Sequence, residues 1–195
     1  GLSYGAGDAV LGLNPAIDNV KSTTDILNLF NDVKSRLKIP TQICVLSHIT
    51  TQLKALKSGA PMDLCFQSIA GSEKALASFG TDVDMLAEAN ELMASKGTSI
   101  GPNYMYFETG QGSELSSNSH NGADQLVMES RCYGLARHYN PFLVNTVVGF
   151  IGPEYIYDTK ELIRAALEDN FCGHMHGLPM GCDICYTNHM KADQN

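Results

Sequence analysis

The sequence lacks three features that would place a protein in a specialised class. No segment reaches the run of about 18–20 apolar residues that a membrane-spanning helix needs. No cluster of lysine and arginine is present, and the formal net charge of −8 would repel nucleic acids and anionic membranes. The chain starts at Gly1 without the basic and apolar segments of a secretion signal. We therefore expect a soluble, cytoplasmic part of a longer protein, with no nucleic acid and no membrane as partner.

Disulfide bonds are also not expected, although the chain contains 6 cysteines. Cys44 and Cys65 lie inside the apolar runs ICVL and LCF, where a cysteine usually packs as a small hydrophobic residue. Without a secretion signal, the reducing cytosol is the expected environment, and it disfavours a disulfide framework.

Six short apolar runs are distributed along the chain and are typical of β-strands. They are residues 9–13, 43–47, 63–67, 104–108, 143–150 and 177–183. Their starts are separated by about 20 to 40 residues, which is the length of a βαβ unit. Because most of the runs are apolar throughout, we expect parallel strands that are covered on both faces.

Amphipathic segments between these runs predict helices. In the first segment, one helix face is formed by Ile26, Leu29, Phe30, Val33 and Leu37. Ser22 and Asp25 resemble a capping box at its start, and Pro40 ends it. Further helices are expected at 82–95, at 122–138 and from Asp158 through Leu162, Ile163, Ala166 and Leu167.

Alternating strands and helices leave two α/β architectures, the open doubly wound sheet and the closed barrel. A doubly wound nucleotide-binding protein has a glycine-rich loop after its first strand. Here the Gly5–Gly7 pair precedes the first apolar run, and Gly110–Gly112 lacks the third glycine. The pattern favours the barrel, with residues 1–195 forming one domain.

Polar side chains follow the apolar runs with unusual regularity. They are Asn14, Pro15, His48, Gln67, Ser68, Glu108 and Asp183. Each has an ordinary structural explanation when taken alone, such as a turn, a helix cap or a solvated charge. In a barrel, however, the carboxyl ends of the strands converge on one cavity. Two carboxylates there could bind an ammonium group, and Asn14 could bind a neighbouring hydroxyl.

A second cluster near the C-terminal end has the composition of a zinc site. It contains Cys172, His174, His176, Cys182, Cys185 and His189. Only one CxxC pair is present, however, and Asp183 lies between its two cysteines at an expected strand end. Because neighbouring strand residues point to opposite faces, Cys182 and Asp183 should not share a site. Packing or loop roles are favoured over a structural zinc ion, and we predict no metal site.

Several long motifs resemble the large subunit of ethanolamine ammonia-lyase. They are GDAVLGLNP (7–15), IPTQICVLSHITTQ (39–52), FQSIAGSEK (66–74), YFETGQGSELS (106–116), GADQLVMESRCYGLARHYNPFLVNTVVGFIGPEY (122–155) and MGCDICYTNHMKADQN (180–195). The resemblance covers nearly the whole chain. It implies a TIM (β/α)8 barrel, of which about six of the eight βα units are present. It also implies radical deamination of ethanolamine to acetaldehyde and ammonia with adenosylcobalamin as cofactor.

The resemblance also assigns roles to particular residues. Substrate contacts fall on Asn14, Glu108, Asp183 and the backbone carbonyl of Phe150, and Glu108 and Asp183 are the catalytic candidates. Cobalamin contacts fall on Pro15, Gln67 and Ser116. The implied partners are ethanolamine, a small subunit and further large subunits within a hetero-oligomer, in the cytoplasm or a bacterial microcompartment.

The chain also departs from the family pattern, because a substrate-binding segment with arginine and glutamine would lie upstream and a final strand downstream. We therefore expect this chain alone to be inactive. Three alternatives remain open at this stage: a cobalamin-dependent lyase or mutase for another small amine or diol, a non-catalytic assembly element of a microcompartment, and a zinc-binding module.

Overall fold

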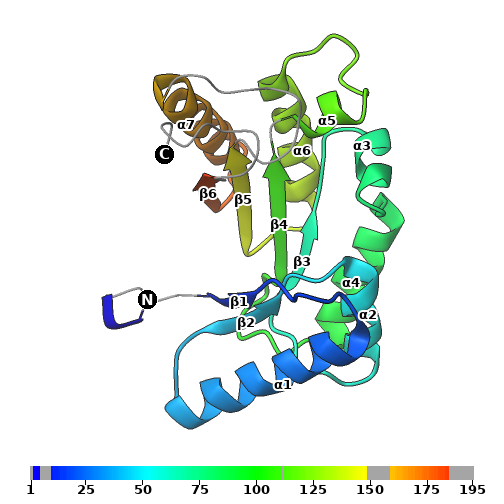
Figure 1. Ribbon diagram of the computed structural model, residues 1–195, viewed down its shortest axis with the longest axis vertical. Helices are drawn as coiled ribbons and strands as arrows, with labels where there is room; N and C mark the ends of the chain where they lie inside the picture. Colours follow the sequence, from blue (N-terminus) through cyan, green and yellow to red (C-terminus); the bar gives the residue numbers. More distant parts are fainter. Residues whose placement is uncertain (1, 5–9, 111, 149–158, 185–195) are drawn as a thin grey trace. The chain divides into compact units, whose positions relative to one another are not determined.

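The computed structural model describes residues 2–4, 10–110, 112–148 and 159–184 (Figure 1). After a short 3-10 turn at Leu2–Tyr4, strands and helices alternate along the chain. The chain divides into two compact units. Unit 1 comprises Gly1–Gln67 and Val83–Met105, and unit 2 comprises Ser68–Asp82 and Tyr106–Asn195.

Unit 1 contains a parallel pair of strands with helices alongside. Strand β1 (Val10–Leu13) pairs with β2 (Gln42–Val45) in parallel register. Strand β3 (Cys65–Ser68) belongs to unit 1 except for its last residue, Ser68, which belongs to unit 2. The helices are α1 (Val20–Leu37), α2 (Ile49–Lys57) and α4 (Val83–Lys96). Helix α1 packs on β2 and α2, and α2 also packs on α4. β2 is almost entirely buried, as expected for a strand covered on both faces.

The predicted start and buried face of helix α1 are wrong in detail. The N-cap is Asn19, whose side chain accepts a hydrogen bond of 2.9 Å from the backbone N–H of Ser22. Thr23 and Leu27 are the buried residues, whereas Leu29 is 56% exposed. The hydroxyl of Thr23 is 2.7 Å from that of Ser47, and this polar contact brings a different face of the helix inward. Leu37, also expected inside, is 67% exposed.

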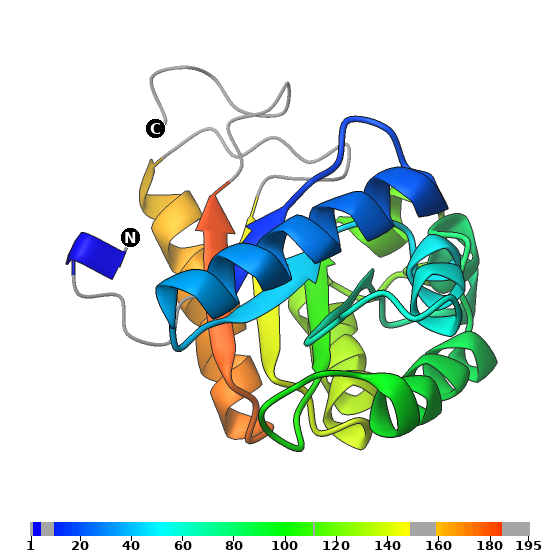
Figure 2. The same ribbon diagram turned by 90° about the horizontal axis from the view of Figure 1, so that it is seen from below.

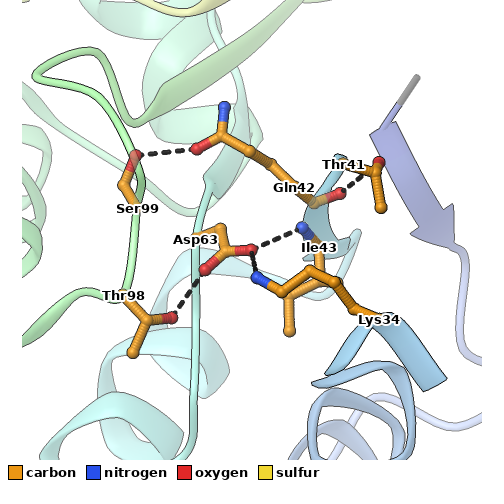
Figure 3. A network of polar contacts seen from close by, with 7 residues as sticks. All are labelled: Lys34, Thr41, Gln42, Ile43, Asp63, Thr98 and Ser99. Atoms are coloured by element: carbon orange, nitrogen blue, oxygen red, sulfur yellow. Dashed lines mark hydrogen bonds and ion pairs between the residues drawn. The ribbon is translucent and has the colours of Figure 1, made fainter. Parts of the chain in front are cut away.

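A buried aspartate joins three segments of unit 1 (Figure 3). The Asp63 carboxylate is fully buried and accepts a 2.9 Å hydrogen bond from the backbone N–H of Ile43 in β2. Oδ1 of Asp63 accepts a 2.7 Å hydrogen bond from the hydroxyl of Thr98, which follows α4. Lys34 of α1 forms an ion pair with Oδ2, the oxygen that Ile43 also contacts. A buried carboxylate needs such partners to offset its lost hydration.

Unit 2 contains parallel β-strands and four helices. Strands β4 (Met105–Gly110), β5 (Leu143–Val148) and β6 (Met180–Ile184) pair in parallel, and the full sheet has the order β3-β4-β5-β6. The helices are α3 (Glu73–Ser78), α5 (Ser113–Ser116), α6 (Gln125–His138) and α7 (Thr159–Met175). Figures 1 and 2 show α7 lying along β5 and β6. Helix α7 contacts both strands, and it also contacts α6.

Helix α7 confirms one predicted helix but not its whole predicted apolar face. Leu162 is buried, and Asp169 on the same helix is fully buried and accepts a 3.0 Å hydrogen bond from Thr146 of β5. Ile163 and Leu167 are 51% and 64% exposed. The helix therefore places a carboxylate against the sheet where an apolar pattern predicts only apolar contact.

The fold class is confirmed as mixed α/β with parallel strands. Each of the six predicted strands is present with boundaries shifted by a few residues, and helices occur at the four predicted places. In the described part of the chain, the strands form a two-stranded and a four-stranded sheet and not one closed barrel. None of the described helices combines the length and the apolar composition needed to cross a membrane.

Candidate functional site

Glu108 lies on β4 with its carboxylate on the face opposite to α6 and α7. The flanking residues Phe107 and Thr109 are buried on the helix side, because successive strand residues alternate between faces. The hydroxyl of Tyr106 donates a 3.2 Å hydrogen bond to Oε1 of Glu108. Burial raises the pKa of Glu108, and the nearby Asp183 carboxylate raises it further, against hydrogen bonds from Tyr106 and Asn145. Glu108 therefore holds its proton at higher pH than an ordinary glutamate does.

Asn145 on β5 connects Glu108 to Asp183. Its Cα is the register partner of Glu108, and its amide lowers the pKa of the neighbouring Glu108 carboxylate. Nδ2 of Asn145 also donates a 2.8 Å hydrogen bond to Oδ2 of Asp183 on β6. Asn145 is only 6% exposed. Three neighbouring strands thus bring two carboxylates and one amide together on one face of the sheet.

Asp183 is the solvent-exposed member of this group. It lies near the end of β6, and its Cα is paired with Val147 of β5, two residues beyond Asn145. A carboxylate in contact with solvent and beside a half-buried one can receive a cation from solution. The structure thus places Glu108 and Asp183 on either side of Asn145, on one face of the sheet.

A small cavity borders Glu108 where β4 ends. It has a volume of about 10 Å³, which is about the space of one water molecule. Its lining includes Glu108, Gly110, Ser68 and Ser113. A larger cavity of about 320 Å³ lies between α3 and α6, beside Arg131, and Glu108 is not among its lining residues. The carboxylate pair, and not the larger cavity, is therefore the candidate site.

The other predicted contacts fall partly in unit 1. Asn14 directly follows β1 and is exposed, and Pro15 beside it is partly exposed. Gln67 is 3% exposed on β3, and its Oε1 accepts a 3.2 Å hydrogen bond from the backbone N–H of Ile49 at the start of α2. This contact is the helix-capping role that the sequence left as an alternative for Gln67. His48, which also follows a strand, is the N-cap of the same helix.

Two further predicted residues belong to unit 2. Ser116 is the last residue of α5, and its side chain is exposed. Phe150 lies outside the described residues. The prediction that Asn14, Phe150, Glu108 and Asp183 contact one substrate stays a prediction.

The cysteine and histidine cluster shows no metal geometry where the structure describes it. Among the described ranges, no group of three or more histidine, cysteine, aspartate or glutamate side chains is arranged to hold a metal ion. Burial, followed by Asp169 and Asp183, raises the pKa of the Cys182 thiol. Cys185 and His189 lie outside the described residues.

Sequence reasoning missed two members of the site, Asn145 and Tyr106. Asn145 is the amide in the otherwise apolar or β-branched run LVNTVV, and an amide within a buried strand must find partners. That signal was present, but it does not say which residues are the partners. Tyr106 precedes Glu108 by two residues and therefore lies on the same face of β4.

Comparison with known proteins gives one consistent family. The family model "Ethanolamine ammonia lyase large subunit (EutB)" matches residues 1–195. The ethanolamine ammonia-lyase large subunit of Salmonella typhimurium is 58% identical over all of this chain, and that of Escherichia coli K12 is 56% identical. The chain spans 43% of the length of each of these curated relatives.

Proposed function

Because the chain belongs to the ethanolamine ammonia-lyase large-subunit family, we propose that it supplies the amine-binding carboxylates of an enzyme that converts ethanolamine to acetaldehyde and ammonia. The observation that carries this proposal is the connection of Glu108 to Asp183 through Asn145. Ethanolamine carries an ammonium group at neutral pH. Two carboxylates on one face can bind that group by charge-assisted hydrogen bonds, which are stronger than hydrogen bonds between neutral groups.

The raised pKa of Glu108 suits a group that shares a proton with the substrate. A carboxylate with an ordinary pKa is a weak proton acceptor near neutral pH, whereas a desolvated one is a stronger acceptor. In the proposal, Glu108 partly takes up a proton of the amino group and so eases its migration. Asp183 keeps the amino group in place, and Asn14 positions the hydroxyl. The backbone carbonyl of Phe150 completes the substrate contacts.

The proposed cofactor is adenosylcobalamin, with Pro15, Gln67 and Ser116 as its contacts on this chain. When bound, it supplies the radical that removes hydrogen from the hydroxyl-bearing carbon of the substrate. The exposed Ser116 and the partly exposed Pro15 fit contact with a large ligand. Oε1 of Gln67 accepts a hydrogen bond from the backbone N–H of Ile49 at the start of α2. In this proposal, Gln67 therefore contributes to the cofactor site by fixing the start of this helix.

The proposal extends to the architecture and the partner. Parallel strands with intervening helices, and acidic side chains near the carboxyl ends of β4 and β6, support a (β/α)8 barrel completed by further βα units. The family name "large subunit" supports association with a small subunit. Assembly into a larger hetero-oligomer and residence in a microcompartment remain predictions from the resemblance.

Reconstitution tests the proposed function. A complete large subunit that contains this chain is combined with small subunit, adenosylcobalamin and ethanolamine, and acetaldehyde is measured by a coupled dehydrogenase. Glu108→Gln should lower kcat much more than it weakens substrate affinity, because proton sharing matters most in the transition state. Glu91→Gln, on the exposed surface of α4, is the matched control and should leave both values unchanged.

Two results would contradict the proposal. Release of aldehyde from a small diol, with none from ethanolamine, would indicate a different lyase. Equal losses of kcat and affinity in Glu108→Gln, expressed as free energies, would reduce Glu108 to a plain binding residue.

A further inference from the structure

We infer that Asn145 is a positioning residue that holds the Asp183 carboxylate beside Glu108 by donating an amide N–H to Asp183. The inference rests on the proposed function, because its purpose is the binding of the substrate ammonium group. Its physical content is separate, since it concerns the spacing and the proton affinity of two acids in the protein without ligand.

The register of the strands places Asn145 between the two acids. Its Cα lies opposite that of Glu108 on β4, and on the other side it lies opposite Gly181 of β6, two residues before Asp183. All three side chains project from the same face, because residues two apart on a strand share a face. A β-sheet holds such neighbours within a narrow range of distances, so the amide of Asn145 lies beside both acids and bonds Asp183.

The chemistry of the partners decides the orientation of the amide. A carboxylate can only accept hydrogen bonds, whereas the amide of Asn145 has two N–H donors on Nδ2 and one acceptor, Oδ1. Nδ2 lies 2.8 Å from Asp183 Oδ2, so one of its N–H donors faces this carboxylate, and Glu108 is the register neighbour of Asn145 on the other side. The reverse orientation would place Oδ1 against the Asp183 carboxylate.

The absence of a side chain at Gly181 leaves room for the amide oxygen. A Cβ atom at this position would lie 2.6 Å from Oδ1 of Asn145, which is closer than real Cβ contacts allow. Asn145 is also 6% exposed, so it cannot move away into solvent without unpacking. The amide therefore depends on a glycine at position 181 for its place, and it is held there by its hydrogen bond to Asp183.

A neutral donor suits a site that must receive a cation. Lysine or arginine at position 145 would hold the carboxylates but would cancel the charge that attracts an ammonium group. An apolar residue there would leave the Asp183 carboxylate without this donor, and the polar amide that lowers the pKa of Glu108 would be lost. Asparagine supplies the donor and adds no charge.

Variants at position 145 test the inference in the reconstituted enzyme with its small subunit and adenosylcobalamin. Asn145→Ala should lower kcat/KM for ethanolamine about tenfold or more and move the acidic limb of its pH profile to higher pH, because the pKa of Glu108 rises. Asn145→Asp adds a like charge and should move that limb further in the same direction. Thr146→Val is the matched control, because it removes a buried hydrogen bond on the opposite face of the same strand.

A second measurement does not depend on turnover. The protonation of Glu108 is titrated by infrared difference spectroscopy in the cofactor-free large subunit, with Glu108→Gln identifying the band. Asn145→Ala should raise the pKa of Glu108, and Thr146→Val should leave it unchanged. If Asn145→Ala leaves both the titration and the acidic limb in place, or loses activity only in step with stability as Thr146→Val does, the inference is overturned.

The outcomes also separate this inference from the proposed function. If the unaltered enzyme does not deaminate ethanolamine, the proposed function fails, whereas the infrared titration still tests the positioning role of Asn145. If the unaltered enzyme deaminates ethanolamine and the Asn145 variants have normal pH profiles, only the positioning role of Asn145 fails.

Discussion

Asn145 Nδ2 donates a 2.8 Å hydrogen bond to Asp183 Oδ2, and the Cα of Asn145 is the register partner of Glu108 on the neighbouring strand. The three residues lie on three adjacent parallel strands, and Asn145 and Asp183 are 38 residues apart in the chain. The contact between Asn145 and Asp183 therefore depends on strand register and not on local sequence. The arrangement makes the protonation of Glu108 sensitive to each of its neighbours.

The first prediction concerns the pH dependence of ethanolamine binding. Burial and Asp183 raise the pKa of Glu108, so its carboxylate is lost at a higher pH than usual as the pH falls. Affinity should therefore decrease as the pH falls through this raised pKa, and binding above it should depend only weakly on pH. Calorimetry over a pH series measures the effect. In Asp183→Asn, the decrease should begin at lower pH, because one cause of the raised pKa is removed, and a shift to higher pH would contradict this explanation.

The second prediction concerns Gly181→Ala. The added methyl group would lie 2.6 Å from Oδ1 of Asn145 and should displace the amide from the Asp183 carboxylate. We expect kcat/KM for ethanolamine to decrease and its acidic limb to move to higher pH, as in Asn145→Ala. Gly134→Ala on α6 is the control, because a Cβ atom there meets nothing within 4 Å. Normal kinetics in Gly181→Ala would show that Asn145 tolerates displacement.

The third prediction concerns the buried Glu129 on α6. Burial raises its pKa, and Asp169 raises it further, from an ordinary value of 4.5. Because the folded protein binds this proton more tightly than the unfolded chain does, the contribution of Glu129 to stability is fully present below pH 4.5 and is lost as pH rises through the raised pKa.

Glu129→Gln removes this titration and should flatten the decrease in stability at neutral and alkaline pH. Urea denaturation of the complete large subunit at several pH values measures it. The exposed Glu91→Gln should leave the pH dependence unchanged. An unaltered slope in Glu129→Gln would show that Glu129 is ionised in the folded protein.

The fourth prediction concerns the polar network around Asp63. Asp63→Ala leaves the backbone N–H of Ile43 and the side chains of Lys34 and Thr98 without this partner. We expect the free energy of unfolding to decrease by about 3–5 kcal/mol, as when one partner of a buried ion pair is removed. Thr98→Val removes a single hydrogen bond and should cost about 1 kcal/mol. Equal losses in the two variants would show that the carboxylate contributes only its contact with Thr98.

Part of the fold could be predicted because it is written in local patterns. In the run that contains Met105 and Phe107, these two residues share one face of the strand, and both are buried. Side chains such as Glu108, placed near the end of such a run, were predicted to lie at the carboxyl edge of a sheet. Helix α1 shows the limit of this reasoning, because Thr23 is buried and Leu29 is exposed. Its inward face contains Thr23, whose hydroxyl is 2.7 Å from that of Ser47, 24 residues away.

The sequence by itself determined the order of the strands and helices, the family, and the positions of Glu108 and Asp183 near strand ends. Only the tertiary structure decided that Asn145 lies between these acids, that Gln67 caps α2 and that Asp169 faces the sheet. The physical reason is range: hydrophobic periodicity acts over one or two turns, whereas a hydrogen bond between strands depends on the register of segments that are far apart in the chain.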